Sequence, residues 1–268
     1  MANTVVSMFL SLSGGQGKTL STYMAGIKSS KLGYETLLID ADPQHNLTDW
    51  LNIEVPENSP TLLEVLKGEV SIEDAIYEVP GREKLFIVPC DRALSTVQYF
   101  LAAQPNPSYI LEKRLKAVLG DFSAVMIDSP PQRGHIVLTS IGASHLVFIP
   151  AEAASKGVGS LSESLTLLEE CRETRAFNGD LGAVIPFRAR VVGLNFTKDT
   201  NENIQAMKEI VGDDKVLPPV LESEVYKRSL NYGKIPSELD ASKADLEIPF
   251  DTLMDMLFVS ETKEVVGK

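Results

Sequence analysis

Cysteine is scarce in this 268-residue chain, which contains only Cys90 and Cys171. The two lie far apart in the sequence and form neither a Cys-x-x-Cys pair nor a Cys/His pattern suited to a metal. We therefore expect both to be small buried side chains in a reducing compartment, and we expect no disulfide or structural zinc.

Long apolar runs are also absent. No stretch approaches the roughly 18 consecutive apolar residues that a membrane-spanning helix needs. The first strand-like run, residues 5–12, begins with no basic segment before it, unlike a secretory signal peptide. These absences predict a cytoplasmic protein without a membrane helix.

Positive charge is in short supply, with 25 Lys and Arg against 37 Asp and Glu and a net charge of −12. A negative field of this kind opposes nucleic acids and anionic lipids at long range. Binding to either would need a local basic patch, for example one that dimerisation assembles.

The chain alternates between apolar, β-branched runs and segments of helical period. A composition of 44% hydrophobic and 23% charged residues is that of an ordinary globular protein. The alternation predicts a single α/β domain, residues 1–268, with a doubly wound, mostly parallel sheet flanked by helices. The expected strands are residues 4–12, 36–39, 85–88, 124–127, 145–150 and 190–195; the expected helices are residues 19–31, 62–67, 71–77, 109–118, 156–172, 203–211 and 222–231.

A glycine-rich segment separates the first expected strand from the first expected helix, which is the setting of a phosphate-binding loop. Glycines let successive backbone N–H groups point at phosphate oxygens, and the helix N-terminus adds partial positive charge. Lys18 should reach the β- and γ-phosphates of ATP, and the Thr19 hydroxyl should bind Mg²⁺. The segment reads Ser13, Gly14, Gly15, Gln16, Gly17, Lys18 and Thr19, and Leu20 belongs to the same nucleotide-binding stretch.

The loop departs from the general P-loop pattern, because Leu12 stands where the first glycine is expected. Its tight form resembles the deviant loop of the ParA/MinD family of Walker-box ATPases. Residues 37–44, Leu-Leu-Ile-Asp-Ala-Asp-Pro-Gln, resemble that family's second motif, and residues 125–131, Val-Met-Ile-Asp-Ser-Pro-Pro, resemble its third. The resemblance covers most of the chain and implies an ATPase that uses Mg²⁺.

Carboxylates follow two of the expected strands, where the ends of parallel strands meet bound phosphates. Asp128 is placed to hold Mg²⁺, through water. The resemblance implies that Asp42 orients or activates the attacking water close to the metal, and Asp40 supports it structurally. The alternative for any one of them is a helix cap or a turn.

Ser13 stands where most ParA and MinD relatives carry a signature lysine that reaches the partner's nucleotide in an ATP-sandwich dimer. A serine here resembles one subgroup, the McdA-type ATPases that distribute carboxysomes over the nucleoid. That subgroup is thought to supply a substitute lysine from later in the chain, and Lys156 is the best candidate. The alternative is a solvated lysine near a helix N-terminus.

By the same resemblance, Asn195 reads the adenine edge at the end of a strand over 191–195, and the backbone near Pro219 also meets the base. A turn residue is the alternative for Asn195.

ParA-type relatives bind DNA without sequence preference as ATP dimers. Two basic clusters could serve, although solvated helix faces explain each equally well. The first, within residues 172–198, has a local net charge of +3 from Arg172, Arg175, Arg188, Arg190 and Lys198 against Glu173 and Asp180. The second consists of Lys227, Arg228 and Lys234 beside Tyr226 and Tyr232.

The favoured function is an ATP-switched homodimer that binds nucleoid DNA and is released when a small adaptor protein stimulates hydrolysis. A MinD-like membrane switch is disfavoured, because the residues from 235 onward carry eight Asp and Glu against three Lys. An ATP-dependent amide ligase on the same fold would need a carboxylate-substrate motif that we do not find. An electron carrier like nitrogenase reductase would need cysteines placed differently from Cys90 and Cys171.

Overall fold

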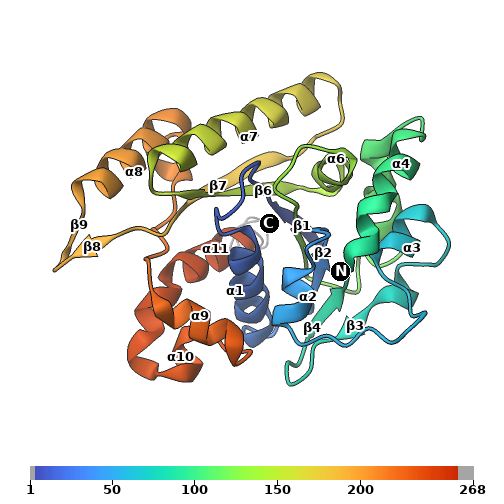
Figure 1. The fold of residues 1–268 in the computed structure, drawn as a ribbon, viewed down its shortest axis with the longest axis horizontal. Coiled ribbons are helices and arrows are strands. Elements are labelled where there is room, and N and C mark those ends of the chain that lie inside the picture. Colours follow the sequence, from blue (N-terminus) through green and yellow to red (C-terminus); the bar gives the residue numbers. More distant parts are fainter. Residues whose placement is uncertain (1–3, 259–268) are drawn as a thin grey trace, which may run out of the picture.

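A seven-stranded sheet runs through the computed structural model, which describes residues 4–258 (Figure 1). The strand order is β3-β4-β2-β5-β1-β6-β7, and every neighbouring pair is parallel except β3 with β4. This confirms the predicted doubly wound α/β fold. The strands are β1 (Val5–Phe9), β2 (Thr36–Asp40), β3 (Tyr77–Glu78), β4 (Leu85–Val88), β5 (Ala124–Asp128), β6 (Leu146–Glu152) and β7 (Asp180–Phe187).

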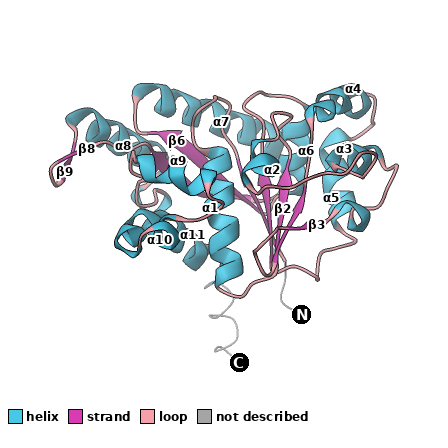
Figure 2. Ribbon diagram, turned by 60° about the horizontal axis from the view of Figure 1, so that its bottom comes forward, coloured by secondary structure: helices cyan, strands magenta, loops and turns pink. Residues whose placement is uncertain are grey.

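Helices cover both faces of this sheet, as the near-continuous apolar strands require (Figures 1 and 2). Alternate residues of a strand serve the two faces, so Val125 packs against one group of helices and Met126 against the other. One face is covered by α3 (Leu62–Lys67), α4 (Val97–Ala102), α5 (Ile110–Leu115), α6 (His135–Ala143), α7 (Ser155–Glu173) and α8 (Lys198–Val211). The other is covered by α1 (Lys18–Lys31), α2 (Asn46–Trp50), α9 (Glu224–Asn231), α10 (Pro236–Leu239) and α11 (Ile248–Phe258).

The strand expected over residues 190–195 is wrong. The last strand of the sheet is β7, and residues 191–196 instead form a two-stranded hairpin, β8 (Val191–Val192) and β9 (Asn195–Phe196), at one end of the molecule (Figure 1). Its tip exposes Val192 and Leu194 to solvent. Apolar residues at this point of the sequence therefore belong to a projection and not to the core.

The helix expected over residues 71–77 is also wrong. It is replaced by a short 3₁₀ turn, Glu73–Ala75, and by the antiparallel edge strand β3. Near the C-terminus, the apolar helix α11 buries Phe250 and Leu253 against α1. Within residues 4–258, no helix combines the length and the apolar character that crossing a bilayer requires. The ends of the predicted 1–268 domain lie outside the described residues, and a single domain remains a proposal.

Candidate nucleotide-binding site

The glycine-rich loop connects the interior strand β1 to the start of α1. Gly15 and Gly17 adopt left-handed backbone angles, with φ of 80° and 95°. Gly17 is the N-cap of α1, and the first helical turn has neither a side-chain cap nor an acidic residue. The free N–H groups of this helix end therefore face the loop, as an anion site requires.

Gly17, the third glycine of the loop, also meets a close neighbour. A Cβ atom on Gly17 would lie 2.5 Å from the ring of Phe187, the last residue of β7. Since real Cβ atoms do not approach a ring so closely, this position accepts glycine only. The Phe187 ring thereby forms part of the wall of the site.

Lys18 is only 6% exposed although it carries a charge. Its ammonium nitrogen donates to the carbonyl oxygen of Ser13 at 3.3 Å, which folds the side chain back along the loop. Burial lowers the pKa of Lys18, while the nearby carboxylates of Asp128 and Asp42 raise it in opposition. A buried cation held against a ring of N–H groups suits the terminal phosphates of a nucleotide.

Asp40 ends β2 and acts as an anchor for the segment that follows. Its carboxylate accepts hydrogen bonds from the backbone N–H and the hydroxyl of Thr48, at 2.8 and 2.7 Å, and from the N–H of Asp42 at 3.3 Å. Burial raises the pKa of Asp40 to about 6, although the bonds from Thr48 lower it. Asp42 in turn accepts from the N–H of Gln44 at 3.0 Å and faces the cavity.

Asp128 ends β5 directly beside Asp40 in the sheet register. It is fully buried, and within residues 4–258 no well-formed hydrogen bond reaches either carboxylate oxygen, although the Thr19 hydroxyl lies close enough to favour the ionised form. Burial and the neighbouring Asp40 raise the pKa of Asp128 well above its usual range, and Thr19 and Lys18 lower it. A buried carboxylate left without a partner has the donor chemistry for a cation.

Mg²⁺ usually binds through one or two protein oxygens together with phosphates and water. The Thr19 hydroxyl and the unpartnered Asp128 carboxylate fit that requirement. Consistently, no group of three or more His, Cys, Asp or Glu within residues 4–258 is arranged to hold a metal alone.

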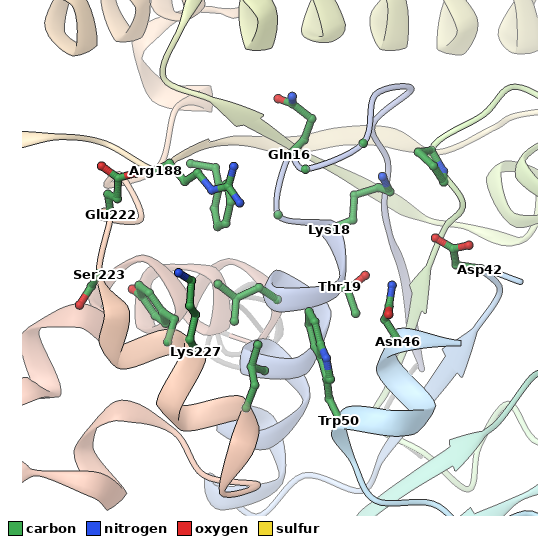
Figure 3. A pocket seen from close by; sticks show the side chains of 18 of the residues that line it. Gln16, Lys18, Thr19, Asp42, Asn46, Trp50, Arg188, Glu222, Ser223 and Lys227 are labelled. Carbon is green, nitrogen blue, oxygen red and sulfur yellow. The ribbon is translucent and has the colours of Figure 1, made fainter. Parts of the chain in front are cut away.

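A cavity of about 510 Å³ opens in front of the loop (Figure 3). Lys18, Thr19 and Asp42 lie on one side of it, and Arg188, Glu222 and Lys227 lie on the other. Of the sequence-predicted residues, those lining the cavity are Gly14, Gly15, Gln16, Gly17, Lys18, Thr19, Leu20 and Asp42. The residues predicted for the phosphate end therefore share one cavity, and their roles stay predictions.

The residues predicted for the base end do not line the cavity. Asn195 lies in the exposed strand β9, and neither it nor Pro219 is among the residues that line the cavity. The cavity wall opposite Lys18 and Thr19 is lined instead by Phe187, the last residue of β7, by Arg188, which follows it, and by residues 221–224 with part of α9. The rule that ligands meet the carboxyl ends of parallel strands would have found Phe187 and Arg188 if β7 had been located.

Lys156 lies in the first turn of α7. Its ammonium nitrogen donates to the carbonyl oxygen of Gly14 at 3.4 Å, so the cation touches the phosphate loop from outside the cavity. Ser13 offers no positive side chain at this place, and Lys156 lies within reach of the same loop.

The structure divides the first basic cluster expected to meet DNA and buries one aromatic ring of the second. Arg172 and Arg175 lie before β7 and Arg188 and Arg190 after it, which separates them by about 26 Å of strand. In the second cluster, Tyr226 is buried and donates to the Leu246 carbonyl, so only Tyr232 presents an aromatic ring to solvent.

Comparison with known proteins places the chain in a family. A family profile described as an AAA domain matches residues 4–181. Maintenance of carboxysome distribution protein A from Synechococcus elongatus is 39% identical over 247 residues, which cover 92% of this chain and 96% of the relative. The protein of the same name from Gloeothece citriformis is 41% identical over 255 residues, covering 95% and 97%.

A solved structure extends the similarity to three dimensions. The ATP complex of a Cyanothece McdA variant superposes with a TM-score of 0.92 at 40% identity, covering 96% of this chain and 97% of the other. Sequence and fold therefore agree over nearly the whole length.

Proposed function

This chain belongs to the ParA/MinD family of P-loop ATPases, within its McdA-type group, and from that premise we propose that it positions cargo on the nucleoid. The proposed cycle has three steps. ATP joins two subunits, the dimer binds DNA without sequence preference, and a small adaptor protein stimulates hydrolysis and releases it. The proposed cargo is the carboxysome, and the proposed location is the cytoplasm at the nucleoid.

The observation that carries this proposal is the combination of a complete phosphate site with near-full-length similarity to carboxysome-distribution proteins. In phosphoryl transfer the protein contributes mainly positioning and charge neutralisation. We assign the N–H groups of the loop and Lys18 to the phosphates, and Asp42 to the attacking water. Thr19 and Asp128 would hold Mg²⁺, which supplies positive charge against the phosphate oxygens.

Dimerisation through ATP is the second part of the proposal. We assign to Lys156 the task that a lysine at position 13 performs in most relatives, namely contact with the partner's nucleotide. The contact between Lys156 and the Gly14 carbonyl supports this assignment, because it places an exposed cation on the outer side of the loop.

The experiment that tests the function is binding of the purified protein to non-specific duplex DNA, with ATP, with ADP and without nucleotide, at two salt concentrations. Salt-sensitive binding seen only with ATP would support the proposal. Absence of binding in all three states would overturn it.

Two other functions remain as outcomes of that test. A membrane switch predicts ATP-dependent binding to anionic liposomes, which the acidic flank of α11, with Asp251 and Asp255, disfavours. An amide ligase predicts that a small carboxylate substrate accelerates ATP turnover. If DNA binding is absent, the first result would assign the function of a membrane switch, and the second would assign the function of an amide ligase.

A further inference from the structure

Arg188 occupies a position in the nucleotide cavity that no sequence motif indicates. It follows the last residue of β7 and lines the cavity wall opposite Lys18 and Thr19 (Figure 3). Its backbone is left-handed, with φ of 52°, which is uncommon for a side chain of this size. The chain thus turns sharply here and directs the guanidinium inward, away from the β8–β9 hairpin.

The guanidinium lies over the tip of the phosphate loop. Its Nη1 atom is 3.9 Å from the position that a Cβ atom on Gly15 would occupy. Its central carbon lies 5.5 Å from the centroid of the Phe187 ring, which supports one face of the group. Phe187 itself packs against Gly17, so the loop, the ring and the guanidinium form one stack.

The guanidinium is also free to bind a ligand. Its nearest carboxylate oxygen belongs to Glu152 at 3.9 Å, too far for a hydrogen bond, and the side chain is half exposed. No hydrogen bond from the Arg188 guanidinium occurs within residues 4–258. Arg190, two residues on, differs in each respect: its Nε donates to Glu222 at 2.9 Å, and it does not line the cavity.

We propose that Arg188 binds the phosphate chain of the nucleotide within its own subunit. The five donors of an arginine suit phosphate oxygens, and they approach here from the open side of the loop. Lys18 then holds the phosphates from within the loop and Arg188 from across the cavity. Together, the two cations would neutralise charge on the phosphate chain from opposite sides, in addition to the contact in trans assigned to Lys156.

The test is titration calorimetry of ADP with the full chain at three salt concentrations. The proteins are the unaltered chain, Arg188→Gln, Arg188→Lys and the matched control Arg190→Gln. We expect Arg188→Gln to weaken ADP about ten- to a hundredfold at low salt, the size of a lost charge-assisted contact. The dependence of affinity on salt should become shallower, because one ionic contact is gone.

The other two variants identify the cause. Arg188→Lys keeps the charge and should restore most of the salt dependence, whereas a merely structural role would not respond to charge. Arg190→Gln removes the same charge close by and should match the unaltered chain. The proposal is overturned if Arg188→Gln binds ADP within twofold of the unaltered chain, or if Arg190→Gln is equally weak. Weaker binding with an unchanged salt dependence would also overturn it, since that pattern indicates contact with the base.

Discussion

The ammonium nitrogen of Lys156 lies 3.4 Å from the carbonyl oxygen of Gly14, so the start of α7 and the tip of the phosphate loop are in direct contact. The two residues are 142 positions apart in the chain. A substitution in the first turn of α7 can therefore affect the phosphate loop, and through it the nucleotide, without altering a residue that lines the cavity.

The first prediction concerns this contact. Lys156→Ala should lower ATP-dependent dimerisation and leave ADP affinity within about twofold, because the cation lies outside the cavity of its own subunit. Light scattering after size exclusion, with ATP and with ADP, measures the dimer fraction. Lys198→Ala is the control, because Lys198 pairs with Glu202 on α8. Unchanged dimerisation in Lys156→Ala would remove Lys156 from the proposed mechanism.

The second prediction concerns Gly17. Gly17→Ala places a Cβ atom on the Phe187 ring in a left-handed backbone, so ATP binding should be lost. Stability should also fall, by about 1–3 kcal/mol. Gly159→Ala is the control: it lies in α7 with nothing within 4 Å, and should be neutral or stabilising by up to about 1 kcal/mol. Retention of ATP binding in Gly17→Ala would show that the ring moves aside.

The third prediction separates stability from activity at Asp128. Its carboxylate is fully buried beside Asp40, and within residues 4–258 it lacks a well-formed hydrogen bond, so Asp128→Asn should stabilise the nucleotide-free protein by about 1–3 kcal/mol. ATP hydrolysis should be lost in the same variant, and chelation of Mg²⁺ should produce the same loss in the unaltered chain. Denaturant unfolding and phosphate release measure the two effects. Asp121→Asn at an exposed site should change neither, and a destabilised Asp128→Asn would contradict the prediction.

The fourth prediction concerns pH and the pair Arg82–Glu238, which joins the β3–β4 turn to α10 through two contacts of 2.7 Å. Burial raises the pKa of Glu238. Hydrogen bonds from Arg82, from the Ile235 N–H and from Lys31 lower it by more than burial raises it, so that the pKa falls to about 2. Because the folded pKa lies below the usual value of 4.5, the carboxylate stabilises the protein above pH 4.5. That stabilisation is lost as the pH falls from 4.5 towards 2.

The corresponding variant is Glu238→Gln. It should be less stable than the unaltered chain by about 2 kcal/mol at pH 7, and the difference should shrink below pH 4.5. Thermal unfolding followed between pH 7 and pH 3 measures it. Glu202→Gln, at an exposed ion pair, should show little difference at any pH. If the stability difference between Glu238→Gln and the unaltered chain stays constant between pH 7 and pH 3, the Arg82–Glu238 ion pair is not the cause of that difference.

The order of elements around the phosphate loop could be read from the sequence because several signals agree there. An apolar strand, a glycine-rich turn and a helix of correct period meet at residues 5–31, and α3 was predicted with its observed bounds, Leu62–Lys67. The strand-end carboxylates Asp42 and Asp128 were located by the same rule of parallel sheets. The local sequence pattern was sufficient to predict the elements in these segments, because the strand, turn and helix signals agree there.

The cavity wall formed by Phe187 and Arg188 could not be predicted from the sequence, because β7 lacks the usual residue pattern of a strand. Gly182 and Pro186 lie within it, and both residue types argue against a strand. The structure supplies a reason for Gly182: a Cβ atom there would meet the Phe148 ring at 2.7 Å. Pro186 is tolerated because β7 is an edge strand, and neither fact is visible before the sheet is assembled.

The position of β1 between β5 and β6 has a consequence for synthesis on the ribosome. β1 spans Val5–Phe9, yet both of its partners, β5 and β6, begin only at Ala124 and Leu146. At about 5–20 residues per second, the first strand waits several seconds or longer without a neighbour while its apolar surface is open to chaperones. The ATP site is thus begun by β1 and the loop that follows it, and it is completed only after β5 and β6 have emerged.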